Sequence, residues 1–142
     1  MSTTETVPPG DKVYLDAPYV SVRWVSAGRW VQVEWKAWAN SPEYRAAHET
    51  VLLALRENRS SKNLIDAMAA RVISDADQRW LIEDWIPRAI AAGRRWTAVV
   101  LPKSALGRTI SENIDKRPHP DRTKVQYFQT VEEAAGWLAT VN

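Results

Sequence analysis

The chain has 142 residues, of which 45% are hydrophobic and 25% charged, and its formal net charge is +2. No apolar run approaches the roughly 20 residues that cross a bilayer, so we expect one globular, cytoplasmic domain without a transmembrane segment. The small charge imbalance argues against nucleic acid as a partner. The absence of cysteine excludes disulfides and thiolate chemistry.

The N-terminal part of the domain is predicted to be a small antiparallel unit. Residues 1–12 are polar and indicate a flexible tail, so the domain is expected to span 13–142. After a short strand near Val13, two runs of alternating apolar residues flank Gly28, which is typical of a β-hairpin. The side chains on the face that helices should cover are Val20, Val22, Trp24, Val31, Val33 and Trp35.

An amphipathic helix should follow the hairpin. Asn40 is a suitable cap, since a proline and an acid occupy the next turn. Apolar residues then recur every three or four positions as far as about Asn58. His48 falls on the apolar side of this helix and is expected to be a hydrogen-bonded packing residue. The predicted buried positions are Tyr44, Ala47, His48, Val51, Leu52 and Leu55.

The stretch 63–102 forms the centre of the predicted fold. Residues 63–66 and 96–101 are typical of short buried strands, and a helix over 74–92 connects them. A helix between two such strands predicts a right-handed crossover and therefore a parallel sheet. Pro87 lies within this crossover helix, where we expect a bend and not a break.

The remaining elements are a weaker helix after Ser104, a strand at 125–128 and a terminal helix capped by Thr130 and Glu133. The expected order is three strands followed by α-β-α-β-α-β-α. This order predicts an α/β fold, a mixed sheet with about four helices packed mainly on one face.

The element order resembles the STAS domain (sulfate transporter and anti-sigma-factor antagonist), particularly its small stand-alone bacterial relatives. The residues that carry the likeness are Asn63–Asp66, Asp77–Trp80, Trp85–Pro87, Ala98–Pro102, Tyr127–Phe128, Glu132–Ala134 and Trp137–Leu138. The resemblance implies a STAS-like mixed sheet and a regulatory role without a cofactor.

Regulatory members of that family carry a phosphorylated serine after the central strand. Asp66 matches the aspartate that opens the family's motif, but Ala67, Met68 and Ala69 follow it here, so the acceptor serine is missing. Ser74 occupies a comparable helix start, either as a plain cap or as a phosphorylation site.

The leading hypothesis is a non-catalytic regulatory or protein-interaction module. On a regular helix Trp80 lies about 140° around the axis from Trp85, which places it on the outer face unless a neighbouring loop covers it. An exposed tryptophan is a candidate anchor for a protein partner or for a second copy in a homodimer. The residues expected at this surface are Ser74, Asp77, Trp80, Glu83 and Asp84.

Two other functions stay open. Stand-alone relatives look similar to the CRAL-TRIO lipid-transfer fold, which implies a carrier or sensor of a small amphiphile, and an apolar cavity would favour it. An enzyme is the second alternative, although we find no nucleophile–base pair, and two distant histidines make no metal set. The basic loop 116–124 is either simply solvated or binds an anion. The residues of such an anion site would be Arg117, His119 and Arg122.

Overall fold

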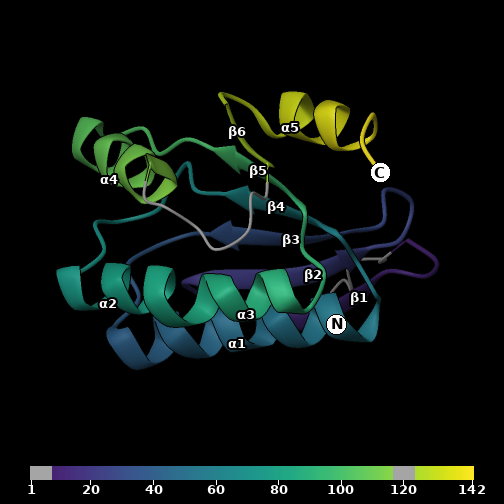
Figure 1. The fold of residues 1–142 in the computed structure, drawn as a ribbon, viewed down its shortest axis with the longest axis horizontal. Coiled ribbons are helices and arrows are strands. Elements are labelled where there is room, and N and C mark those ends of the chain that lie inside the picture. The colour runs from purple at the N-terminus through teal and green to yellow at the C-terminus, as the bar shows by residue number, and fades with distance from the viewer. Residues whose placement is uncertain (1–7, 117–123) are drawn as a thin grey trace, which may run out of the picture.

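The computed structural model describes residues 8–116 and 124–142. Within these ranges the chain forms a six-stranded mixed sheet whose strands lie in sequential order, β1-β2-β3-β4-β5-β6 (Figure 1). The predicted α/β class is confirmed. The predicted anion site at Arg117, His119 and Arg122 lies outside the described residues.

The antiparallel part of the sheet contains the predicted hairpin. It consists of β1 (Lys12–Asp16), β2 (Val20–Val25) and β3 (Trp30–Trp35). All the side chains predicted for the covered face of the hairpin are buried in one core cluster: Val20, Val22, Trp24, Val31, Val33 and Trp35. The alternation of apolar residues therefore determined the correct face.

Three parallel strands extend the sheet from β3: β4 (Lys62–Asp66), β5 (Trp96–Val100) and β6 (Lys124–Phe128). Their register is unstaggered, because Trp30 pairs with Lys62, Lys62 with Trp96, and Trp96 with Lys124. The carboxyl ends of these strands therefore meet at one edge of the sheet, and the loops after β3, β4 and β5 all leave from that edge.

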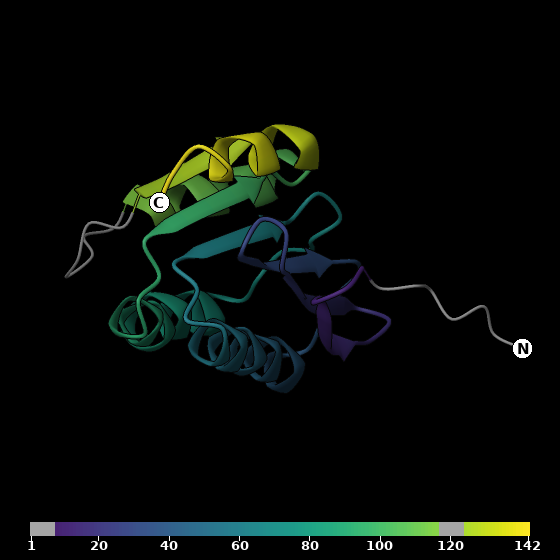
Figure 2. The same ribbon diagram turned by 90° about the vertical axis from the view of Figure 1, so that its right-hand side faces the viewer.

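The helices lie on both faces of the sheet. From β3 to β6 each new strand joins the same edge of the growing sheet. Right-handed crossover connections in such a sheet place their helices on one face. Figure 2 shows α1 and α3 on that face and α5 on the opposite face. The first helix is α1 (Ser41–Glu57). The crossover helix consists of three consecutive segments, α2 (Asp75–Trp80), η1 (Leu81–Trp85) and α3 (Ile86–Ala91). The last two helices are α4 (Ala105–Lys116) and α5 (Val131–Leu138).

Side-chain caps start the helices where the sequence predicts. The Asn40 side chain accepts a hydrogen bond from the N–H of Glu43 at 2.9 Å, and the Glu43 carboxylate accepts from the N–H of Asn40 at 3.0 Å. Thr130 caps α5 in the same way, through the N–H of Glu133. These caps satisfy backbone donors that a helix cannot pair internally.

The crossover helix is continuous but irregular. Its cap is Ser74 and its helical backbone continues to Ala92, as predicted, but η1 is a π-helical turn in which the N–H of Ile86 bonds to the carbonyl of Leu81. Pro87 lies just after this turn. A proline disfavours a regular α-helical turn before it, because it has no N–H to donate and its ring clashes with a carbonyl of that turn. A π turn contains more residues than an α turn. Side chains on either side of η1 therefore point in directions around the helix axis that differ from those on a regular α-helix.

Two separate cores hold the fold together. The larger one lies between the sheet and the helices α1 and α3. The smaller one lies under α5 and contains Trp30, Leu64, Ala98, Val100, Ala134 and Leu138. The Lys62 ammonium donates to the carbonyl of Leu138 at 2.7 Å and so fixes the end of α5 on this core.

Gly28 gives a direct test of the hairpin packing. A Cβ at Gly28 would overlap with the ring of Trp30, a buried member of the smaller core. We expect Gly28→Ala to lower the free energy of unfolding by about 1–3 kcal/mol. Gly136 lies inside α5 with open space around it, so Gly136→Ala should raise that energy by about 0.5–1 kcal/mol. Urea unfolding measures both; equal effects of the two changes would contradict this packing.

Candidate functional site

A cavity of about 270 Å³ lies between the sheet and the connecting helices. Ile65, Val99 and Tyr127 form one row of its sheet wall, because they are partners in the register of β4, β5 and β6. Thr97 and Val125 form the next row inward. Residues of α1, the crossover helix and α4 complete the wall. Ligands of α/β proteins commonly bind at such carboxyl ends of strands.

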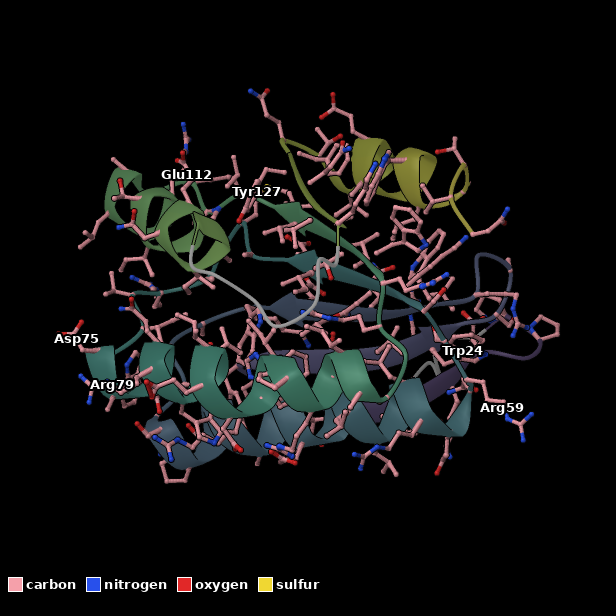
Figure 3. The ribbon with its side chains drawn as sticks, viewed as in Figure 1. Trp24, Arg59, Asp75, Arg79, Glu112 and Tyr127 are labelled. Atoms are coloured by element: carbon pink, nitrogen blue, oxygen red, sulfur yellow. The ribbon has the colours of Figure 1, made fainter. Side chains whose placement is uncertain are left out.

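The cavity reaches solvent at that same edge of the sheet. Its exposed lining residues come from the loops 36–41 and 71–74, which we call the mouth. Trp38 and Val72, both at the mouth, are 64% and 50% exposed. Figure 3 shows Tyr127 beside α4, on the side of the molecule away from Arg59.

Aromatic rings line much of the helical wall. Tyr44 stacks on Trp35 with ring centroids 5.3 Å apart, and His48 lies 4.4 Å from Tyr44 and 4.9 Å from Trp85. The indole N–H of Trp85 donates to the carbonyl of His48 at 2.7 Å. The rings are thus fixed by packing and by buried hydrogen bonds, and the cavity is bounded by largely apolar surface.

His48 is a neutral part of this wall. Its Nδ1 lies 2.9 Å from the carbonyl of Tyr44, which requires a hydrogen on Nδ1 and makes Nε2 the acceptor in the neutral ring. Burial lowers the pKa of His48 to about 4, so the ring is uncharged at neutral pH. The predicted role as a hydrogen-bonded packing residue is confirmed.

Arg94 is a buried cation in the cavity lining. It is 4% exposed, and its guanidinium carbon lies 5.2 Å from the centroid of the Trp85 ring. Gly93 turns the chain after α3 with a φ of 107°, and the N–H of Arg94 then bonds to the carbonyl of Ala89. Within the described residues no carboxylate pairs with Arg94. Burial lowers the pKa of Arg94 to about 10, so it stays charged at neutral pH.

Two of the unpaired buried polar atoms belong to residues that line the cavity, Arg94 and Thr97. Among the described residues, the buried side-chain atoms without a hydrogen-bond partner are Asn63 Oδ1, Arg94 Nε, Trp96 Nε1 and Thr97 Oγ1. Thr97 and Arg94 line the cavity, and Asn63, the register partner of Thr97, borders a second cavity of about 10 Å³. Such atoms are rare in folded proteins. The region around Arg94 and Thr97, which we call the inner end, therefore has unused hydrogen-bonding capacity.

The predicted surface residue Asp77 is buried instead. It is 4% exposed, and its carboxylate accepts hydrogen bonds from the Ser41 hydroxyl at 2.7 Å and from Arg45 Nε at 3.0 Å. Burial raises the pKa of Asp77, but these hydrogen bonds outweigh it and hold the pKa below its usual range. Asp77 thus joins the first turns of α1 and α2 beside the mouth.

The prediction that Trp80 lies on the outer face of the crossover helix is wrong. Trp80 is partly buried and packs edge-on against Tyr44 and His48 at 6.4 and 5.8 Å, with the Arg45 guanidinium 5.2 Å from its ring. It is α1, not a loop, that covers it. The reason is the π turn, which reduces the angle between Trp80 and Trp85 so that both face α1.

The other predicted surface residues are solvent-exposed. Ser74, Glu83 and Asp84 are all exposed, and Asp84 accepts a hydrogen bond from Arg88 at 3.0 Å. As contacts for a partner they stay predictions. Sequence reasoning missed Arg94, because no local pattern distinguishes it from the exposed Arg95 that follows.

Comparison with known proteins found no match to a family model, to a curated protein or to a solved structure. The resemblance to the STAS domain therefore stays a prediction. The part of the chain that the structure describes holds no group of three or more His, Asp or Glu side chains arranged for a metal ion, and no helix long and apolar enough to span a membrane.

The buried state of His48 predicts a pH dependence of stability. Its pKa falls from 6.5 to about 4 on folding, so the unfolded chain binds the proton more readily. The contribution of neutral His48 to the free energy of unfolding should therefore be fully present above pH 6.5. It should be lost as the pH falls towards 4, by about 3 kcal/mol in total. Urea unfolding between pH 7 and 4.5 measures this loss. The His48→Gln variant should show a shallower dependence, and identical slopes would contradict the assignment.

Proposed function

We propose that the protein binds a small, largely apolar amphiphile in this cavity, as a carrier or a sensor. The observation that carries the proposal is the cavity itself, about 270 Å³ between sheet and helices, lined by aromatic and aliphatic side chains and reaching solvent at the mouth. Cavities of this composition at the carboxyl ends of parallel strands are typical ligand sites.

The volume limits the size of the ligand. A cavity of roughly 150 Å³ accommodates benzene, so a cavity of about 270 Å³ suits a ligand of roughly ten non-hydrogen atoms. At about 0.8 kcal/mol for each buried CH₂ group, an alkyl chain of roughly ten carbons gains about 8 kcal/mol on transfer from water into the cavity. The costs of association reduce this gain, and we expect dissociation constants on the order of tens of micromolar.

The walls of the cavity are fixed without a ligand. The bond from Trp85 to the His48 carbonyl joins the crossover helix to α1, and Asp77 joins the first turns of α1 and α2 through Ser41 and Arg45. A site that is formed in advance needs little reorganisation on binding. This supports reversible binding of a small molecule.

The interaction-module hypothesis rests on a smaller surface than expected. Asp77 and Trp80 face α1, which leaves Ser74, Glu83 and Asp84 of the predicted contact residues exposed. The cavity gives more specific support, because its residues converge on one space between the sheet and the helices. We therefore place ligand binding before protein binding.

A side chain that fills the cavity tests this function. Val99 faces the cavity near the carboxyl end of β5, so Val99→Phe should weaken the binding of both decanoate and decanol at least tenfold. Val13→Phe makes the same change on β1, where the side chain is 47% exposed, and should leave both affinities unchanged. Isothermal titration calorimetry measures the affinities, and far-UV circular dichroism confirms folding. If neither probe binds the wild-type protein, or Val99→Phe binds both normally, the proposed function is wrong.

A further inference from the structure

We propose that the natural ligand is a small apolar carboxylate whose charged group pairs with Arg94 and Thr97 at the inner end, while its apolar part extends towards the mouth. This inference rests on the proposed function and specifies its ligand class. Its basis is a cation that is buried, oriented and unpaired within the described residues.

The burial of Arg94 is unfavourable without a partner. A charged group in an apolar interior loses its hydration, and proteins normally compensate this loss with an opposite charge. Three acids of the adjoining helices are engaged elsewhere: Asp77 pairs with Arg45, while Glu49 and Asp84 pair with Arg88. Two more acids of the crossover helix, Asp75 and Glu83, are exposed to solvent. A ligand carboxylate in the cavity would supply the missing negative charge.

The contact with Trp85 orients the guanidinium for such a ligand. A guanidinium that lies over an aromatic ring keeps its N–H donors in its own plane, free for an acceptor at the side. A carboxylate matches that donor arrangement with two parallel hydrogen bonds. The unpaired hydroxyl of Thr97 lines the same cavity and offers one further donor. One arginine and one hydroxyl suit a singly charged head group.

The distribution of charge determines the orientation of the ligand. Asp77 lies beside the mouth, so an anionic head group placed there would meet a carboxylate. Arg71 at the mouth is exposed to solvent, and His48 in the wall is neutral. Arg94 is therefore the buried, unpaired cation among the described lining residues. The head group should lie inward and the apolar chain outward.

A matched pair of arginine substitutions tests the inference. Arg94→Met replaces the cation by an apolar side chain of similar length, and Arg95→Met makes the same change at the adjacent exposed position. Calorimetric titration with decanoate and decanol should show that wild type prefers decanoate. Arg94→Met should lose about 30-fold or more in affinity for decanoate and keep its affinity for decanol. Arg95→Met should resemble wild type with both probes.

A second readout separates ligand binding from a merely structural role. Without ligand, Arg94→Met should have a higher thermal midpoint than wild type, because it removes a buried unpaired charge. Thr97→Val should weaken decanoate binding by roughly three- to tenfold and leave decanol binding unchanged. A lower midpoint for Arg94→Met together with unchanged decanoate affinity would show that Arg94 only supports the fold, and would overturn the inference.

The two probes also distinguish this inference from the proposed function. If wild type binds decanoate and decanol equally and Arg94→Met changes neither affinity, the ligand is not selected by charge, although the cavity still binds amphiphiles. If wild type binds neither probe, the inference falls together with the proposed function. Loss of decanoate binding alone in Arg94→Met supports both.

Discussion

The hydrogen bond from the indole of Trp85 to the carbonyl of His48 fixes the arrangement on which the candidate site depends. It joins the crossover helix to α1 in the middle of the larger core, where Trp85 is 2% exposed. The same indole contacts the His48 ring and lies under the Arg94 guanidinium. One side chain therefore positions the helical wall of the cavity, the neutral histidine and the buried cation.

The sequence predicted those parts of the fold that local chemistry determines. The hairpin face followed from the alternation of Val20, Val22 and Trp24, and the start of α1 followed from the pairing of Asn40 with Glu43. In each case the signal lies within a few residues, because a strand has a period of two and a cap acts over one turn.

The candidate site was harder to predict because it depends on departures from regular geometry and on tertiary contacts. A regular helix would put Trp80 on the outer face, but the π turn before Pro87 turns it towards α1. Arg94 resembles the next arginine in sequence, and only the turn at Gly93 and the position of Trp85 bring it inside. The burial of a side chain in a turn after a helix leaves no periodic pattern in the sequence, so the burial of Arg94 could not be predicted from it.

The sequential order of the strands has a consequence for the synthesis of the protein. Each described strand after the first pairs with the strand made just before it, so none of these six strands waits for a distant partner that the ribosome has yet to deliver. The hairpin can form first, and each later helix and strand can then dock on the exposed edge of a sheet that already exists. Pairing between neighbours in sequence keeps loop closure short, which favours fast folding and limits the time during which unpaired edges are open to aggregation.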